Sequence, residues 1–458
     1  MDEAREGELR RSLGLWSASA LIAGSMIGTG IFFFVSDVAA YLPSRTAIIC
    51  AWIAGAAIAS CGALSIAELA SSYPETGGVY VFLQRAYGRF VSFLYSWAEF
   101  LIMRPGSFGI MVVAFAKFFG DFLGLGNDTS SLWTKSVAIV AVIVLTGINI
   151  VGVRAGGMVQ NILTTIKMFC LIAIIGIGVA FALGALDTHE VTIESGDHKE
   201  GSFFLLFGAA LIPIMWTIGG WDESPFVAEE VRNPQRNLPL SILGGLWMVA
   251  LLFILVNVAY LAILSPTEMA GTKGITATVA MERAIGSGAR KILDLALIIC
   301  TLGAANGLAL TGGRIAYAAG RSQALFQWFA TTHPRTKTPV RSLLAQCVIT
   351  CLVVAILEHP LTLLFYTGLA YWTFAGLMAA SVLIMRRRDP HRKRPFRVWA
   401  YPLVPILFVV ASAGMAVSIV IEDTRKDTHN VIATVIILAA GALLYLLQVI
   451  LFHKQEKN

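Results

Sequence analysis

Charged side chains are scarce in this chain of 458 residues. Asp, Glu, Lys and Arg together make up 14% of it, whereas 57% of the residues are hydrophobic and the mean hydropathy is +0.75. A soluble globular domain carries about 25% charged residues. This shortage excludes an ordinary soluble protein and indicates an all-α membrane protein whose only domain is its membrane-spanning mass.

Cysteines in loops and recognisable cofactor motifs are also lacking. All six cysteines fall inside apolar stretches, which favours small packing residues over a disulfide framework. The seven histidines have no metal-ligand spacing, and the sequence contains neither a P-loop nor a dinucleotide fingerprint. We therefore expect no cofactor, no metal and no nucleotide-driven pump. The cysteines are Cys50, Cys61, Cys170, Cys300, Cys347 and Cys351.

Long apolar runs are what the chain has in abundance. We predict twelve transmembrane helices, because each run is long enough to cross a hydrocarbon core that needs about 20 residues. The predicted spans lie near residues 14–42, 46–72, 88–119, 134–151, 157–184, 203–231, 238–263, 290–320, 341–357, 361–385, 400–421 and 430–452.

The distribution of Lys and Arg predicts the orientation of these spans. With the N-terminus in the cytoplasm, the cytoplasmic segments hold 21 of the 34 basic residues and the outer segments hold nine. Basic residues concentrate on the cytoplasmic side of membrane proteins. We therefore expect a multi-pass protein of the cell (plasma or inner) membrane with both termini in the cytoplasm. The basic run from Arg386 to Arg397 is then a topology anchor beside anionic lipid, and we expect no nucleic-acid partner.

Two of the apolar stretches are interrupted by glycine, within residues 24–30 (GSMIGTG) and residues 217–221 (TIGGW). Glycine disfavours a helix. An unpaired backbone group in hydrocarbon costs several kcal/mol unless it lines a cavity or meets a ligand. Close helix packing would explain one such cluster. Two clusters at matching positions of two halves instead indicate the binding site of a transporter.

The interrupted stretches are the first and the sixth, and this offset predicts an inverted repeat. An offset of five spans makes the second half enter the membrane from the opposite side, so spans 1–5 and 6–10 form a five-plus-five repeat with two extra helices. The broken helices present free N–H groups and free carbonyls, which together suit both ends of a zwitterion. The expected segments are a cytoplasmic N-terminus 1–13, repeats 14–185 and 201–386, a basic loop 387–399, helices 11 and 12 in 400–452, and a tail 453–458.

Several motifs along most of the chain carry a family resemblance. They are GSMIGTGIF from Gly24, YPETGGVY from Tyr73, Glu99 through Arg104-Pro105, GGWD from Gly219, EEVRNPQRNLP from Glu229, AANG from Ala304 and RPFR from Arg394. With them the chain resembles the L-type amino acid transporter family of the amino acid–polyamine–organocation superfamily. The resemblance implies the LeuT-like fold, with discontinuous helices 1 and 6. It also implies sodium-independent exchange of amino acids by alternating access.

The resemblance also implies which residues bind the substrate. Backbone N–H groups of Gly28, Thr29 and Gly30 are expected to meet its carboxylate. Carbonyls of Met26, Trp216 and Gly219 are expected to meet its ammonium group, and the Trp216 side chain is expected to close over the substrate as a gate. Secondary candidates are Ser25, Asp222 and Asn306; Asn306 either hydrogen-bonds into the site or bonds another helix.

Lys167 lies deep in the fifth span, roughly 18 Å along the helix at about 1.5 Å per residue. A charge at that depth is functional by default. The resemblance implies that its ammonium group approaches the first break, where sodium-coupled relatives hold a sodium ion. We expect Lys167 to replace sodium or to bind and release a coupling proton; a structural lysine satisfied by carbonyls is the alternative. Glu68 and Arg104 are expected in buried ion pairs.

The loop between spans 3 and 4, residues 120–133, contains no cysteine. Eukaryotic members of the family link to a heavy-chain glycoprotein through a cysteine in that loop. We therefore expect a stand-alone prokaryotic transporter with no disulfide-linked heavy chain. Asp222 stands where many relatives that select neutral substrates have an uncharged residue. Neutral L-amino acids are favoured as substrates, and cationic amino acids or polyamines are the alternative.

Three other functions compete with exchange. Proton-coupled symport of amino acids is the first. A membrane amino acid sensor is disfavoured because the predicted loops offer no soluble domain to transmit a signal. A membrane enzyme is disfavoured because the buried Lys167, Glu68, Glu99 and Arg104 do not form a recognisable catalytic arrangement.

Overall fold

The computed structural model describes residues 11–125, 131–191, 193, 196–272, 275–322, 324–356, 360–426 and 430–455. These residues form helices joined by connections, and the β-type pairing found among them is an isolated parallel bridge between Leu13 and Val231. The predicted all-α architecture is thereby confirmed. Three predicted segments lie partly outside the described residues: the N-terminal segment (1–10), the loop 120–133 (126–130) and the tail (456–458).

Helices cover every apolar stretch that the sequence predicts as a span. In chain order the elements are α1 (Leu15–Met26), α2 (Gly30–Phe33), α3 (Val35–Tyr41), α4 (Arg45–Ser72), α5 (Val79–Tyr87), α6 (Arg89–Ala98), η1 (Glu99–Met103), α7 (Arg104–Phe122), α8 (Leu132–Val151), α9 (Val153–Ala182), α10 (Phe203–Thr217), η2 (Ser224–Glu230), α11 (Pro234–Ile263), α12 (Pro266–Ala270), α13 (Thr276–Ile285), α14 (Ala289–Gly320), η3 (Ala324–Phe329), α15 (Val340–Ile356), α16 (Pro360–Arg388), α17 (Leu403–Lys426) and α18 (Asn430–Gln455).

Within the described ranges, nine helices are long and apolar enough to cross a membrane, and three apolar helices are shorter. The shorter ones are α1, α10 and α15. Two of them, α1 and α10, are the interrupted stretches. The 12 residues of α1 extend about 18 Å, against a hydrocarbon core of about 30 Å. The chain is therefore a multi-pass membrane protein, and its predicted twelve crossings require α1 and α10 to be halves of broken spans.

The continuations of the two broken spans are not simple half-helices. After the first break, two short helices, α2 and α3, meet at Phe34. After the second, the expected helical half is a 3-10 helix, η2, rather than an α-helix. Pro225 removes a backbone donor in its first turn, and Val227 leaves helical dihedral angles (φ −107°, ψ 23°).

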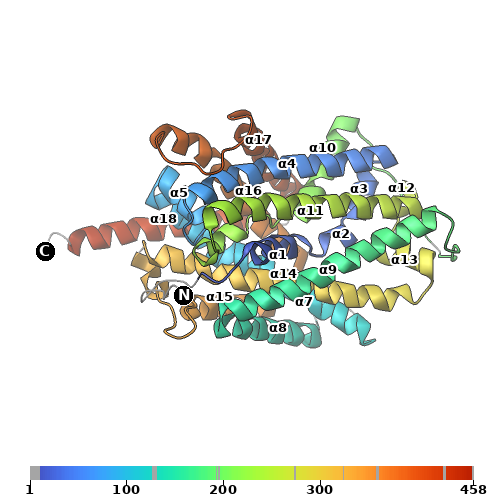
Figure 1. Cartoon of the computed structure of the whole chain (residues 1–458), viewed down its shortest axis with the longest axis horizontal. Helices are drawn as coiled ribbons and strands as arrows, with labels where there is room; N and C mark the ends of the chain where they lie inside the picture. The colour runs from blue at the N-terminus through green and yellow to red at the C-terminus, as the bar shows by residue number, and fades with distance from the viewer. Residues whose placement is uncertain are drawn as a thin grey trace.

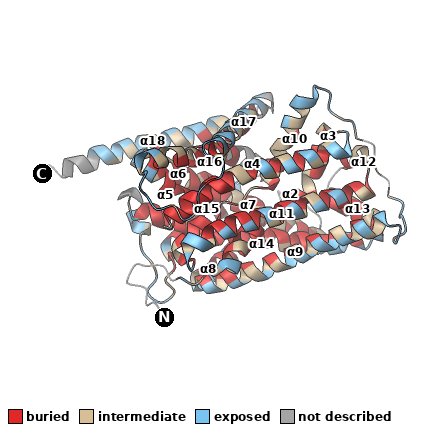
Figure 2. Ribbon diagram, turned by 45° about the horizontal axis from the view of Figure 1, so that its top comes forward, coloured by how far each residue is buried: buried red, intermediate tan, exposed pale blue. Residues whose placement is uncertain are grey.

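The long helices run side by side along the longest axis of the molecule (Figure 1). At their centre α14 packs against α1, α7 and α9, and 72% of its 18-residue apolar stretch is buried. By contrast, 11% of the corresponding apolar stretch of α18 is buried, and this helix extends past the bundle at one end (Figure 1). Buried residues concentrate toward the middle of the bundle and exposed ones toward its outside (Figure 2). The candidate site thus lies among the elements that surround α14.

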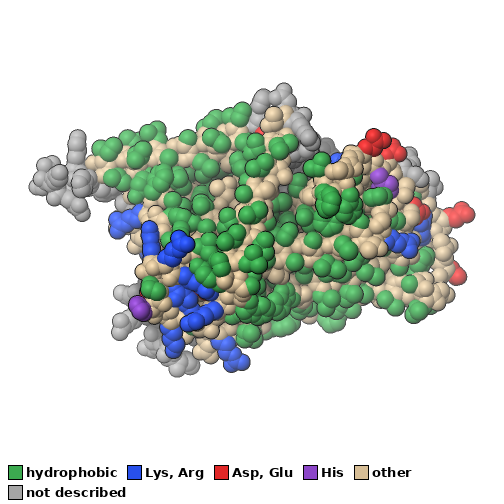
Figure 3. Space-filling view, turned by 90° about the horizontal axis from the view of Figure 1, so that it is seen from above, with side chains coloured by type: hydrophobic (Ala, Val, Ile, Leu, Met, Phe, Trp, Pro, Cys, Tyr) green, Lys and Arg blue, Asp and Glu red, His purple; other side chains and the backbone are tan. Residues whose placement is uncertain are grey.

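The surface divides into zones along the same axis. Hydrophobic side chains cover the middle of the face seen in Figure 3, most of the visible Lys and Arg side chains gather at one end, and the visible Asp and Glu side chains gather at the other. An apolar belt between two polar ends is the surface that a bilayer requires.

Candidate functional site

The first interruption separates α1 from α2 and leaves backbone donors free. Across it, the Gly28 N–H donates to the Met26 carbonyl at 2.9 Å. Within the described part of the chain, the N–H groups of Thr29 and Gly30 have no protein acceptor. The free donors of the break are therefore those of Thr29 and Gly30, whereas the expected groups of Gly28 and Met26 are bonded to each other.

The second interruption lies directly against the first. Gly220 has φ +98°, and a Cβ atom at this position would lie 3.0 Å from the carbonyl carbon of Ser25. A Cβ atom at Gly30 would lie 2.6 Å from Oγ1 of Thr217. Glycine is thus required at both positions by the close approach of backbone and side chain. The structure brings the two breaks together, as their sequence positions predict. The place where residues 24–30 meet residues 216–221 is called the crossing below.

The end of α10 supplies a carbonyl to this crossing. The Gly219 N–H donates to the Trp216 carbonyl at 3.1 Å, and the Trp216 residue is half-buried. Of the carbonyls expected to hold an ammonium group, that of Met26 accepts from Gly28 and that of Trp216 accepts from Gly219, so both already have a backbone partner.

Lys167 of α9 reaches the same crossing from behind α1. Its side chain is fully buried, and Nζ donates to the carbonyls of Gly24 and Ile27, each at 2.7 Å. Because α1 ends at Met26, these carbonyls lie in its last turn and just beyond it, where carbonyls lack partners within the helix. The predicted approach of Lys167 to the first break is confirmed.

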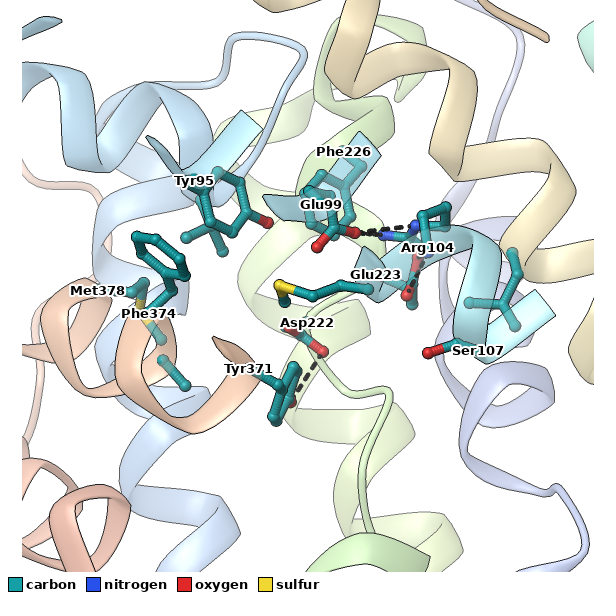
Figure 4. Close-up of a pocket in the computed structure, with 14 residues that line it drawn as sticks. Tyr95, Glu99, Arg104, Ser107, Asp222, Glu223, Phe226, Tyr371, Phe374 and Met378 are labelled. Atoms are coloured by element: carbon teal, nitrogen blue, oxygen red, sulfur yellow. Dashed lines mark hydrogen bonds and ion pairs between the residues drawn. The ribbon is translucent and has the colours of Figure 1, made fainter. Parts of the chain in front are cut away.

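A cavity of about 70 Å³ lies beside the crossing, between η1, α7, α16 and the stretch that follows the second break (Figure 4). Asp222 is the predicted site residue that lines it. The others, Ser25, Met26, Gly28, Thr29, Gly30, Lys167, Trp216, Gly219 and Asn306, do not. The lining residues are Val79, Tyr95, Glu99, Met103, Arg104, Ser107, Asp222, Glu223, Phe226, Leu308, Tyr371, Phe374, Ala375 and Met378.

A buried ion-pair network forms one wall of this cavity (Figure 4). The Arg104 guanidinium contacts Glu99 (NH2 to Oε1, 2.7 Å) and Glu223 (NH1 to Oε1, 2.8 Å). It also donates to the Thr311 hydroxyl at 3.0 Å, and that hydroxyl donates to Glu223 Oε2 at 2.6 Å. The expected buried ion pair of Arg104 is confirmed. The sequence reasoning did not assign Glu223, although two adjacent carboxylates in an apolar stretch were a usable signal.

A π-helical turn brings Glu99 and Arg104 to the same wall. Residues five apart in an α-helix point about 140° apart, because each residue turns the helix by about 100°. Here η1 closes an i→i+5 bond from the Arg104 N–H to the Glu99 carbonyl, which places the two residues one above the other. Pro105 explains the widened turn, because its ring displaces the carbonyl four residues earlier and it offers no N–H.

The charges of the cavity wall do not balance. Arg104 is shared between Glu99 and Glu223, and the third carboxylate, Asp222, has no ion-pair partner among the described residues. The nearest polar contact described for Asp222 is the Tyr371 hydroxyl, which donates to Oδ1 at 3.5 Å. Three carboxylates thus face one guanidinium, which in a poorly solvated site favours a bound cation.

Asn306 belongs to a network between helices and does not line the cavity. Its Nδ2 donates to Gln160 Oε1 at 2.8 Å and to the Gly156 carbonyl at 3.2 Å, and its Oδ1 accepts from Asn149 at 3.1 Å. The alternative in which Asn306 bonds another helix is the one found. Ser25 lies close to α14, because a Cβ atom at Gly307 would be 2.7 Å from Ser25 Oγ.

One buried ion pair and three backbone hydrogen bonds lie at one end of the crossing, where the chain passes from η2 into α11. The Glu230 carboxylate accepts from Arg314 Nε at 2.8 Å, and both side chains are fully buried. The Glu230 carbonyl accepts from the N–H groups of Ser12 and Leu13, each at 2.9 Å, and the Arg232 N–H donates to the Leu13 carbonyl at 2.8 Å. The segment before α1 is thereby bonded to the segment after η2.

Comparison with known proteins places these features in a family. The family model described as amino acid permease matches residues 13–442. The chain is 30% identical over 446 residues to the b(0,+)-type amino acid transporter 1 of Homo sapiens, covering 97% of this chain and 89% of that protein. It is 31% identical over 421 residues to the serine/threonine exchanger SteT of Bacillus subtilis, covering 91% and 93%. It is 28% identical over 402 residues to the large neutral amino acids transporter small subunit 2 of Oryctolagus cuniculus, covering 87% and 74%. The chain therefore belongs to the amino acid permease family, as a membrane transporter of its L-type amino acid transporter group and not as an enzyme.

Proposed function

We propose that this protein exchanges amino acids across the cell membrane by sodium-independent antiport. The observation that carries the proposal is the crossing of two interrupted helices, with the Lys167 ammonium group on the carbonyls that end the first. A relative with 31% identity is named as an exchanger. Exchange requires alternating access, and a five-plus-five inverted repeat within the twelve proposed membrane spans would provide the two halves that move.

The substrate backbone is proposed to bind at the crossing. Its carboxylate accepts from the free N–H groups of Thr29 and Gly30, and from Gly28 once the Met26 carbonyl is released. The carbonyls of Met26, Trp216 and Gly219 then accept from the substrate ammonium group. Trp216 closes the site as the gate.

The Lys167 ammonium group is proposed to replace the positive charge of a bound sodium ion. Its ammonium group sits on two carbonyls at 2.7 Å with no carboxylate partner among the described residues, which is the type of oxygen set that a monovalent cation would occupy. A fixed positive charge at this position stabilises the broken end of α1, so transport does not need sodium.

A second candidate function, transport of cationic amino acids, is favoured by the unbalanced cavity. A substrate at the crossing would direct its side chain toward Asp222, which lines the cavity beside Glu223. Because Asp222, Glu223 and Glu99 face a single guanidinium in this wall, its charge favours the end of a basic side chain over an apolar one. Asp222→Asn is expected to lower arginine exchange at least about tenfold relative to leucine exchange.

The control for that variant is Asp187→Asn, because Asp187 is an exposed aspartate in the connection between α9 and α10. Equal arginine-to-leucine ratios in Asp222→Asn and in the unmodified protein would exclude Asp222 from side-chain recognition and leave neutral amino acids as the substrate class.

Transport in proteoliposomes tests the main proposal. The purified chain is reconstituted without any partner protein, and uptake of radiolabelled serine, leucine and arginine is measured with and without internal amino acid. Sodium and proton gradients are varied independently. We expect uptake to require internal amino acid and to be unchanged by the sodium gradient and by the proton gradient. Uptake driven by a pH gradient would show symport instead, and saturable binding without uptake would show a sensor.

The location and assembly of the protein are part of the same proposal. We infer that both termini lie in the cytoplasm, because the basic end of the molecule is then the cytoplasmic end. We also infer a stand-alone transporter. Activity of the chain reconstituted alone supports this assembly, and inactivity restored by a heavy-chain glycoprotein would contradict it.

A further inference from the structure

A second pocket, of about 410 Å³, opens at the basic end of the molecule, away from the helix crossing. Its walls come from the end of α4, the start of α11 and the loop after α16. A volume of this size is within the range of small-ligand sites, which occupy about 300–1,000 Å³. The lining residues are Ser72, Gln235, Asp389, His391, Arg392 and Lys393.

The loop that forms this pocket is held in place by buried bonds. The buried Glu68 carboxylate accepts from Arg386 NH2 and from the Val398 N–H, each at 2.6 Å. Arg394 NH2 donates to the Asp389 carbonyl at 2.7 Å and to the Met385 carbonyl at 3.2 Å. Both ends of the loop are thereby fixed, so its basic side chains belong to a built surface rather than to an unrestrained basic tail.

The guanidinium group of the pocket is oriented by its neighbours. Arg392 NH2 donates to the Ser72 carbonyl at 2.9 Å, and its Cζ lies 4.6 Å from the centre of the Tyr73 ring. The other two donor atoms of the fork, Nε and NH1, have no hydrogen-bond partner among the described residues and can donate to an anion. Lys393 is exposed and has no partner among the described residues, so its ammonium group is also available.

Two features that do not involve basic side chains point to the same kind of ligand. Ser72 is 6% exposed, and within the described part of the chain its hydroxyl has no hydrogen-bond partner. Gln235 is the second residue of the 30-residue helix α11, whose N-terminus has no side-chain cap. Its backbone N–H has no protein acceptor among the described residues. A hydroxyl and a helix N-terminus both donate to an anion.

The charge of the lining is positive despite one carboxylate. Asp389 offsets one of the two charges of Arg392 and Lys393, and its Oδ2 already accepts from the Tyr73 hydroxyl at 3.3 Å. Because oriented donors and a net positive charge converge, the pocket suits a tetrahedral oxyanion with one or two negative charges.

The position of the pocket identifies the source of that oxyanion. Ser72 is the last residue of α4, and Gln235 lies in the first turn of α11. Both helices are long and apolar enough to cross a membrane, so these ends lie at the level of the lipid headgroups. Most of the Lys and Arg side chains visible in Figure 3 gather at one end of the molecule. We propose that this pocket binds the phosphate group of an anionic phospholipid.

Thermal unfolding of the full-length protein, purified in detergent and free of added lipid, tests this site. A ligand that binds the folded state raises the midpoint by mass action. Short-chain phosphatidylglycerol, phosphatidylcholine of the same chain length and inorganic phosphate are titrated separately. We expect phosphatidylglycerol to raise the midpoint in a saturable way and the other two compounds to leave it unchanged.

The location of the phosphatidylglycerol site is tested by two substitutions within the pocket and one matched substitution outside it. Lys393→Gln is expected to weaken the apparent phosphatidylglycerol affinity about tenfold, and Ser72→Ala is expected to weaken it about threefold. Arg397→Gln removes one charge from an exposed residue of the same loop that does not line the pocket. It is expected to keep the affinity within about twofold of the unmodified protein.

The outcomes separate the lipid from other sources of phosphate. Equal responses to phosphatidylglycerol and phosphatidylcholine, or equal losses in Lys393→Gln and Arg397→Gln, would overturn the site. A saturable response to inorganic phosphate that abolishes the response to phosphatidylglycerol would overturn the assignment to lipid. Ser72→Ala removes a hydroxyl that has no hydrogen-bond partner among the described residues, so it tests the pocket even if Lys393→Gln fails to fold.

Discussion

At the scale of single residues, the crossing depends on the hydrogen atom that glycine carries in place of a side chain. Gly220→Ala would place a methyl group 3.0 Å from the Ser25 carbonyl carbon at φ +98°. We expect the free energy of unfolding to fall by about 2 kcal/mol or more, together with loss of transport. Gly147→Ala is the control, because a Cβ atom there meets nothing within 4 Å. It is expected to be neutral or up to about 1 kcal/mol more stable. Thermal midpoints in detergent measure both, and equal midpoints would contradict the close approach.

Lys167 can be tested by a single substitution with a sodium readout. Lys167→Ala leaves two buried carbonyls without their charged donor, and each such bond contributes about 1.5–3 kcal/mol. We expect exchange in sodium-free medium to fall at least about tenfold. Partial recovery with added sodium would show that the ammonium group occupies a cation site.

The control for Lys167 is Lys291→Ala, an exposed lysine near the start of α14. Exchange by Lys167→Ala at the rate of the unmodified protein, with no response to sodium, would leave Lys167 with a structural role. Neither the sodium-replacing nor the proton-coupling role would then hold.

At the scale of elements, the π turn of η1 decides which side chains face the cavity. Pro105→Ala restores a backbone donor and removes the ring that displaces the Leu101 carbonyl. We expect the turn to close as an α-helix and Glu99 to rotate away from Arg104, with transport reduced at least about tenfold. Pro239→Ala in α11 removes a proline from inside another helix and is expected to keep transport. Unchanged transport in Pro105→Ala would show that the wall does not depend on the turn.

The helices that cross the membrane are the elements that sequence patterns predict well. The predicted spans 46–72 and 290–320 agree with α4 and α14 to within one residue at each end, because apolar length alone defines them. The helices α5, α12 and α13 lie in connections and have no such signal. The cavity was also beyond prediction. It is lined by Tyr95, Asp222 and Tyr371, which are far apart in the chain. A single sequence does not show which helix faces meet.

At the scale of the whole molecule, the separation of charge along the long axis predicts how the chain sits in a bilayer. The six native cysteines lie in helices and one of them, Cys50, is exposed, so the labelling of an introduced cysteine is measured against that of the parent protein. Lys199→Cys is expected to react with a membrane-impermeant maleimide in intact cells, whereas Arg397→Cys is expected to react only after permeabilisation. The six-cysteine parent is the control. The reverse pattern would mean that the basic end faces outward.

The backbone bonds of Ser12 and Leu13 to Glu230, and of Arg232 to Leu13, bear on how the two interrupted helices travel. Main-chain bonds of this kind do not yield by rotation of side chains, so a displacement of the segment entering α1 is transmitted to the segment leaving η2. We therefore expect the two segments to move as one unit relative to the rest of the bundle. We expect solvent that enters from that end to pass around this pair of segments and not between the segment before α1 and the segment after η2.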